Sequence, residues 1–368
     1  MKIPVKKYSF ESFIETIISM ELPPPSRLKI ACFLTHFNQW DGDRIPSLKT
    51  IFSSGGIRVE TMGDINMLSG WYFDKQSRQR QLATFHAYLN PETGLLLCFT
   101  DAKIDAIDQT IGNVADTSMG IYYMFISPKI FQGIRSRIME EFPNATCFYF
   151  TAKHLLQFAR KGETRPHIER TIIYHGDDAL QTLQEVRQYY GVTPRIMRYR
   201  IPDMGNYEIK NTGYFTLLSS EKFEPPRKFL LSLVDLASVH VLRSRQIIER
   251  ADFVLIPLKT EQKTFEIPKL LPWVVRFGKQ LDFPDAQSLL ESMVNNGYTI
   301  FNYAMTQGSF RLNGMVIDEK KRNLFTIDVD SEKMIIAPRE KISFDAFLRF
   351  FATIVENFDP EAAIEEFA

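Results

Sequence analysis

The sequence predicts an α+β fold of mixed α/β character. Segments with apolar residues at helical spacing alternate with strand-like segments through the middle of the chain, and strand-like segments lie between two helices near its end. Hydrophobic residues make up 45% of the 368 residues and charged residues 24%, which is the balance of a chain that buries a core. The pattern divides the chain into three parts, residues 1–80, 81–220 and 221–368.

The first part, residues 1–80, is expected to be mostly helical. Apolar residues within 10–18 share one helical face, and Ser9 before them can cap the helix N-terminus. A second helix is expected over residues 26–37, and a short third helix after Pro46.

Residues 26–73 resemble the layout of winged-helix DNA-binding proteins. The helix over 26–37 is followed by a polar turn, by Gly56 and by a helix expected to start near Arg58. A helix-turn-helix places the first residues of its second helix against base edges in the major groove. The resemblance implies DNA binding, and the alternative is a helical cap on the core.

The central part, residues 81–220, is expected to contain a hairpin and two β-α-β units. The hairpin pairs residues 81–89 with residues 95–100 through a turn at 90–94. The two units are expected at 120–127, 129–141 and 146–151, and at 171–175, 177–190 and 195–201. If the strands of each unit share a sheet, they run parallel with a right-handed crossover. A loop at 203–213 and a strand at 214–219 follow.

The last part, residues 221–368, is expected to form an antiparallel meander with helices. An apolar helix is expected over about 227–250. The later elements are a helix at 285–295, strands near 298–303, 309–317, 324–328 and 333–337, and a final helix capped by Ser343. The tail that follows is acidic without a basic residue, which is typical of a solvated segment.

The cysteines, apolar runs and net charge bear on the compartment. Cys32, Cys98 and Cys147 lie far apart without C-x-x-C spacing, so buried thiols are expected in place of a disulfide or a zinc site. No apolar stretch reaches the roughly 20 residues that a membrane span needs. Lysine plus arginine number 44, as do aspartate plus glutamate, so the net charge is zero. We therefore expect a cytoplasmic protein without a membrane partner.

Most motifs of catalytic and nucleotide-binding proteins are absent from the sequence. It has no G-x-x-x-x-G-K-[ST] phosphate loop, no G-x-G-x-x-G, no H-E-x-x-H and no G-x-S-x-G. This absence favours a protein that is not an enzyme, and it predicts no cofactor and no metal site.

A basic, aromatic segment between Lys153 and Arg200 is the main candidate for a binding site. Arginine interleaved with aromatic residues suits backbone phosphates and exposed bases. On a strand, Arg198 and Arg200 point the same way and Arg195 the opposite way. The residues assigned to nucleic-acid binding are Arg160, Lys161, Arg165, Arg170, Arg195, Arg198 and Arg200. The alternative is a solvated face whose arginines form surface ion pairs.

Two smaller groups are candidate catalytic sites. Glu92, Asp101 and Lys103 flank a strand, and they resemble the PD-(D/E)xK pattern of metal-dependent nucleases with glutamate in place of the first aspartate. The resemblance implies Mg²⁺ as a cofactor, whereas the alternative is that Asp101 caps a helix. His175 and Asp178 lie at a strand-to-helix junction, where they could act as an acid-base pair or where the aspartate could cap the helix.

Together these patterns favour a nucleic-acid-associated binding protein with DNA or RNA as its partner. The first alternative is a non-catalytic protein-interaction or assembly subunit that binds a protein partner or a second copy of the chain. That alternative predicts an exposed apolar patch of several hundred Å². The second alternative is a metal-dependent nuclease or other hydrolase, and it alone requires Mg²⁺.

Overall fold

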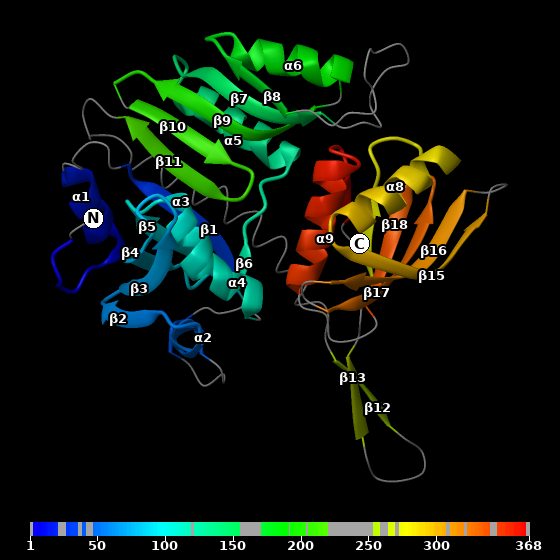
Figure 1. The fold of residues 1–368 in the computed structure, drawn as a ribbon, viewed down its shortest axis with the longest axis horizontal. Helices are drawn as coiled ribbons and strands as arrows, with labels where there is room; N and C mark the ends of the chain where they lie inside the picture. The colour runs from blue at the N-terminus through cyan, green and yellow to red at the C-terminus, as the bar shows by residue number, and fades with distance from the viewer. Residues whose placement is uncertain are drawn as a thin grey trace. The chain divides into compact units, whose positions relative to one another are not determined.

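The described part of the chain forms two compact units (Figure 1). The first unit holds the described residues up to 219, and the second holds those from 253 onward. The computed structural model describes residues 3–20, 27–35, 39–41, 47–118, 121–154, 171–190, 192–203, 205–219, 253–257, 264–268, 272–306, 310–319, 322–338 and 344–365.

A large antiparallel sheet forms the first unit. Its strands pair in the order β2-β3-β4-β5-β1-β11-β10-β9-β7-β8, and β6 also pairs with β1. The strands are β1 (Lys29–Thr35), β2 (Arg58–Met62), β3 (Ile65–Asp74), β4 (Gln79–Leu89), β5 (Leu95–Thr100), β6 (Ile121–Tyr123), β7 (Thr146–His154), β8 (Thr171–His175), β9 (Val192–Ile201), β10 (Gly205–Lys210) and β11 (Tyr214–Ser219). Residues 30–35 are all buried, because β1 is a central strand that is covered on both faces.

Helices cover both faces of the sheet around β4 and β5. Successive residues of a strand point to opposite faces, so Phe85 and His86 of β4 mark the two sides. Phe85 lies in a buried core with residues of α2 (Leu48–Ser54) and of the helical segments α3 (Ile104–Ile107), η1 (Asp108–Gly112, a π-helix) and α4 (Asn113–Thr117). On the other side, α1 (Phe10–Ser19) places the ring of Phe13 5.7 Å from His86 and 5.4 Å from Phe99.

The helices α5 (Pro128–Glu141) and α6 (Ala179–Tyr190) lie on one face of β7–β9. Arg135 of α5 is near enough to Arg187 of α6 and to Tyr199 of β9 for its positive charge to lower the pKa of each, although burial has the larger effect on both. Tyr199 is buried under these helices, together with Met197 two residues earlier on the same face. The residues between and after them therefore point to the opposite face of the sheet.

A second antiparallel sheet, with two helices, forms the second unit. Its strand order is β15-β16-β17-β18-β14-β19. The strands are β14 (Trp273–Arg276), β15 (Tyr298–Thr306), β16 (Arg311–Asp318), β17 (Leu324–Asp330), β18 (Lys333–Pro338) and β19 (Ala363–Glu365), and the helices are α8 (Phe283–Asn295) and α9 (Phe344–Asn357). Phe350 of α9 packs edge-on against Tyr298 and Phe325 of the sheet. A separate hairpin pairs β12 (Phe253–Pro257) with β13 (Thr264–Pro268).

The structure confirms the α+β class and several expected elements. The hydroxyl of Ser9 accepts a hydrogen bond from the backbone N–H of Ser12 at the start of α1, as a capping residue does. The β4–β5 hairpin turns where expected, with Gly94 in the left-handed region at φ 69°. The C-terminal strands form the expected meander. All three cysteines are buried free thiols.

The helix-turn-helix expected within residues 26–73 is wrong. The segment expected as its first helix contains β1, and the segment after Arg58 forms β2 and β3. A short apolar run such as residues 30–34 has no periodicity that separates a buried strand from a helix. Only the short helix after Pro46 is found, as α2. The boundary expected at residue 80 falls inside β4, so one sheet joins the first two expected parts.

Other expectations for the central and last parts need correction. The loop expected over 203–213 contains β10, which pairs with both β9 and β11. The first expected β-α-β unit is wrong, because β6 pairs with β1 and not with β7. In the second unit β8 and β9 run in the same direction, as expected, because both are antiparallel to β7, which lies between them. Part of the acidic tail forms β19, which pairs with β14, and the carboxylate of Glu365 forms an ion pair with the guanidinium of Arg276. The helix expected over 227–250 and Ser343 lie outside the described residues.

None of the helices in the described ranges is long and apolar enough to cross a membrane.

Candidate nucleic-acid interface

The structure describes three of the seven predicted nucleic-acid contacts, and all three lie on β9. Arg198 and Arg200 point to the face opposite α5 and α6, whereas Arg195 is the extra residue where the pairing of β9 with β7 shifts its register. The remaining four, Arg160, Lys161, Arg165 and Arg170, lie outside the described residues.

Arg198 combines an aromatic contact with a buried counter-ion. Its guanidinium carbon lies 4.1 Å from the centre of the Tyr149 ring on β7. Its Nε donates a hydrogen bond to Oε2 of Glu208 on β10 at 2.7 Å, and Glu208 is buried. A charge-assisted hydrogen bond to a buried carboxylate fixes the guanidinium plane over the ring. Because this bond uses Nε, the two terminal nitrogens remain oriented for another acceptor.

Arg200 makes a second, looser contact of the same kind. Its guanidinium carbon lies 5.1 Å from the centre of the Phe148 ring, and Nη1 lies 3.2 Å from Oδ1 of Asp177. The register of β7 shifts between Cys147 and Tyr149, so Phe148 is the extra residue of a bulge. The imidazole of His175 meets the rings of Phe148 and Tyr149 edge-on at 5.8 and 6.3 Å.

We call this set the basic-aromatic face; it consists of Phe148, Tyr149, His175, Arg198 and Arg200. Its open side continues over β8, where the side chain of Ile173 is 65% exposed. Lys210 adds a third cation, with Nζ 3.6 Å from Oε1 of Glu208. Three cations therefore lie next to two carboxylates, Glu208 and Asp177, and the local charge is positive.

A row of polar side chains extends from this face across the sheet. The register places Lys29 of β1 opposite Thr216 of β11, Thr216 opposite Glu208, and Glu208 opposite Arg198. Burial lowers the pKa of Lys29, and the charge of Asp101 opposes this effect. Thr216 is buried, and its hydroxyl has no hydrogen-bond partner among the described residues. The polar face therefore spans β8, β7, β9, β10, β11 and β1.

The three predicted nuclease residues do not converge. Glu92 precedes β5 and Asp101 follows it, so the length of a six-residue strand, about 20 Å, separates them. Nζ of Lys103 instead lies 3.0 Å from Oδ1 of Asp74, and its hydrogen bond holds the pKa of that carboxyl at about 2. No cluster of three potential metal ligands occurs within the described ranges.

His175 and Asp178 have separate partners. Tyr174 donates a hydrogen bond from its hydroxyl to Oδ1 of Asp178 at 2.7 Å, just before α6 begins. His175 contacts aromatic rings of β7 on the basic-aromatic face. Asp178 therefore lies at the start of a helix with a tyrosine as its partner, and His175 packs against aromatic rings. The two residues do not form an acid-base pair.

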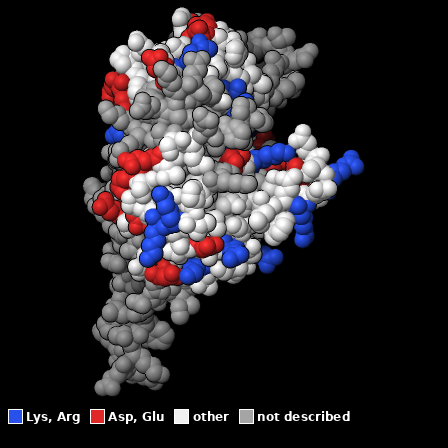
Figure 2. All heavy atoms as spheres, turned by 90° about the vertical axis from the view of Figure 1, so that its left-hand side faces the viewer, with Lys and Arg blue, Asp and Glu red and all other residues white. Residues whose placement is uncertain are grey.

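The sequence-based predictions missed a second surface, on the β3–β4 hairpin. We call it the hairpin surface; it consists of Trp71, Phe73, Lys75, Arg78, Arg80 and Leu82, and all six side chains are exposed. Figure 2 views the side of the molecule on which this hairpin lies in Figure 1, and basic side chains project from that side. The sequence does contain a signal for this surface, because Trp71 and Phe73 occupy alternate positions before a basic turn. The signal was missed because the segment was assigned to a helix and a loop.

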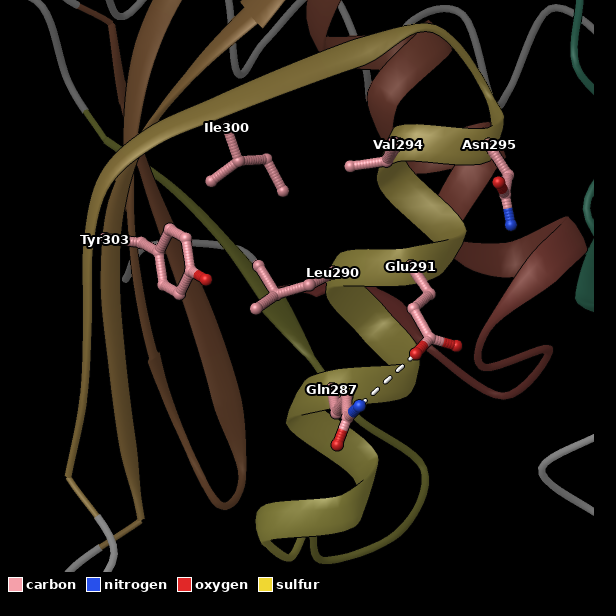
Figure 3. Close-up of a pocket in the computed structure, with 7 residues that line it drawn as sticks. All are labelled: Gln287, Leu290, Glu291, Val294, Asn295, Ile300 and Tyr303. Atoms are coloured by element: carbon pink, nitrogen blue, oxygen red, sulfur yellow. Dashed lines mark hydrogen bonds between the residues drawn. The ribbon is translucent and has the colours of Figure 1, made fainter.

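The second unit contains a groove between α8 and β15 of about 520 Å³ (Figure 3). Leu290 and Val294 of the helix face Ile300 and Tyr303 of the strand across it. Glu291 is its one ionisable lining residue apart from the phenol of Tyr303. A groove with apolar walls and an acidic rim suits an apolar ligand and repels phosphate.

Comparisons with known proteins place the basic-aromatic face inside a matched family region. A family middle domain, AF_0896_M, matches residues 130–212. This region runs from α5 to the end of β10 and contains the whole basic-aromatic face. A protein of Archaeoglobus fulgidus, described as uncharacterized, is 28% identical over an alignment of 375 positions that covers 96% of this chain and 94% of that protein. The similarity therefore extends across both units.

Proposed function

We propose that the protein is a cytoplasmic, nucleic-acid-associated binding protein that contacts DNA or RNA through its basic-aromatic face. The observation that carries the proposal is the stacking of Arg198 on Tyr149 and of Arg200 on Phe148, with His175 at the edge of both rings. Phe148 is buried and Tyr149 is half-buried, so a polymer of phosphates and bases would meet chiefly the guanidiniums that lie over these rings.

The counter-ions Glu208 and Asp177 orient the two arginines without cancelling their function. Glu208 is buried, so a phosphate on the open side meets the terminal nitrogens of Arg198 and not the carboxylate. Asp177 is exposed, and an exposed ion pair is worth about 1 kcal/mol or less, so a phosphate can displace it.

The test measures the salt dependence of oligonucleotide binding. Fluorescence anisotropy with labelled DNA and RNA of about 15 nucleotides gives Kd at about 50 mM and about 200 mM KCl. The double variant Arg198→Ala, Arg200→Ala is expected to bind more weakly. Its slope of log Kd against log salt is expected to fall by about 1.4 for single strands, because each phosphate contact contributes about 0.7.

Arg276 and Arg311 provide a matched control in the second unit. Both are exposed strand arginines with a carboxylate partner, Glu365 at 2.6 Å and Asp328 at 2.6 Å. The double variant Arg276→Ala, Arg311→Ala is expected to leave binding and slope unchanged. Equal losses in both double variants would refute a specific role of the basic-aromatic face, and no binding of any oligonucleotide at low salt would refute the proposed function.

A further inference from the structure

The hairpin surface presents large apolar side chains to solvent. The exposed fractions are 64% for Trp71, 48% for Phe73 and 54% for Leu82. The register places Trp71 opposite Leu82 and Phe73 opposite Arg80, so these four side chains share one face. Trp71 and Phe73 are two residues apart on one strand, which separates their rings by about 7 Å.

The hairpin is held rigidly from behind. Its other face contributes Leu68, Tyr72 and Phe85 to the buried core. The side-chain amide of Gln109 in η1 accepts a hydrogen bond from the backbone N–H of Phe73 and donates one to the carbonyl of Phe73, at 2.9 and 3.1 Å. At the turn, Asp74 accepts hydrogen bonds from the backbone N–H groups of Gln76 and Ser77. The exposed rings are therefore presented by a pre-formed platform, which lowers the entropic cost of binding.

The cations beside the rings are uncompensated. The side chains of Lys75, Arg78 and Arg80 form no ion pair or hydrogen bond with any residue that the structure describes. Asp74, the carboxylate nearest to them in sequence, is buried and is already paired with Lys103. In contrast with Arg198 and Arg200, these three side chains have no carboxylate partner to displace among the residues that the structure describes.

The shape of the surface selects the kind of polyanion. α1 packs on the same face of the sheet, over His86 and Tyr88 of β4, where Phe10 stacks on Tyr88 at 3.9 Å. His86 is four residues from Leu82, about 13 Å along the strand, and a helix stands about 10 Å high. Because α1 projects above the exposed rings on the same face, a flat membrane cannot lie against them. A duplex keeps its bases stacked inside, whereas a single strand offers bases to the rings and phosphates to the cations.

We propose that the hairpin surface binds single-stranded nucleic acid. Bases stack on Trp71 and Phe73, Leu82 supports the Trp71 ring, and phosphates pair with Lys75, Arg78 and Arg80. This inference rests on the proposed function and narrows its ligand to single strands. It also adds a contact on the sheet face opposite the basic-aromatic face.

The test uses labelled oligothymidylate and oligouridylate of about 15 nucleotides and a duplex of the same length. Trp71→Ala and Phe73→Ala are each expected to weaken single-strand binding about 5-fold to 150-fold, because one stacked base is worth that factor. Trp71→Phe is expected to retain most of the binding. Arg78→Ala with Arg80→Ala is expected to lower the salt slope by about 1.4. Duplex binding is expected to change little in the ring variants.

Tyr303→Ala is the matched control, because Tyr303 is an aromatic residue of a strand in the second unit with 56% exposure. Unchanged single-strand binding in the Trp71→Ala, Phe73→Ala double variant would overturn the inference; if Arg198→Ala with Arg200→Ala still lost binding, the proposed function would stand. Equal loss of duplex and single-strand binding would also overturn it. So would binding of phosphatidylserine vesicles or of an acidic peptide, but no oligonucleotide, by the hairpin surface.

Discussion

Acid is expected to destabilise the first unit through His86. This imidazole is 1% exposed, lies against Phe13, and has no hydrogen-bond partner at Nδ1 among the described residues. Burial lowers the pKa of His86 to about 4, whereas an unfolded histidine titrates near about 6.5. As the pH falls below about 6.5, the unfolded chain takes up the proton first. Stability is therefore complete above that pH, is lost down to about pH 4, and then levels off.

The expected loss follows from 1.36 kcal/mol for each pH unit. Between about pH 7 and about pH 5, His86 should reduce the free energy of unfolding by about 2 kcal/mol. His86→Phe keeps a ring of similar size and removes the titration, so it should lose about 2 kcal/mol less over this interval. Urea denaturation followed by circular dichroism at both pH values measures the difference. The same pH dependence in His86→Phe and in the natural chain would refute the buried neutral histidine.

Three further variants test the site and the packing. Glu208→Gln removes the negative charge shared by Arg198 and Lys210, so oligonucleotide binding should become tighter, with a slope against salt steeper by about 0.7; unchanged binding and slope in anisotropy titrations would show that these cations do not contact the oligonucleotide. Gly94→Ala should destabilise the β4–β5 hairpin by roughly 1–2 kcal/mol, because φ is 69° there, and denaturation curves measure it. Phe350→Ala should destabilise the second unit by about 3–5 kcal/mol, because the ring is fully buried against Tyr298 and Phe325, and a calorimetric transition that does not move would contradict this.

Part of the candidate site could be predicted from the sequence. The alternation of strand residues placed Arg198 and Arg200 on one face of β9, as the structure has them, whereas Arg195 lies at an irregularity in the pairing of β9 with β7. Their partners were not predicted. Glu208 lies on β10, in the segment 203–213 that was expected to be a loop, and Tyr149 lies on β7, far from β9 in the sequence. A bulge in β7, which no periodicity reveals, presents Phe148 to Arg200.

The grouping of Glu92, Asp101 and Lys103 shows the opposite case. Their spacing fits a motif, yet a hairpin strand separates the two acids and a third strand supplies the partner of Lys103. Adjacency in sequence was a poor guide because an extended strand carries its two ends about 20 Å apart.

The sequence by itself determined those elements whose signals are local. Helical spacing with a capping residue placed α1, turn chemistry placed the β4–β5 hairpin, and isolated cysteines in apolar runs predicted buried thiols. Only the tertiary structure decided that residues 29–35 form a central strand, that one sheet joins the first two parts of the chain, and that Trp71, Phe73 and Arg80 share an exposed face. The physical reason is that strand pairing depends on hydrogen bonds and burial between segments far apart in sequence, which a local pattern does not encode.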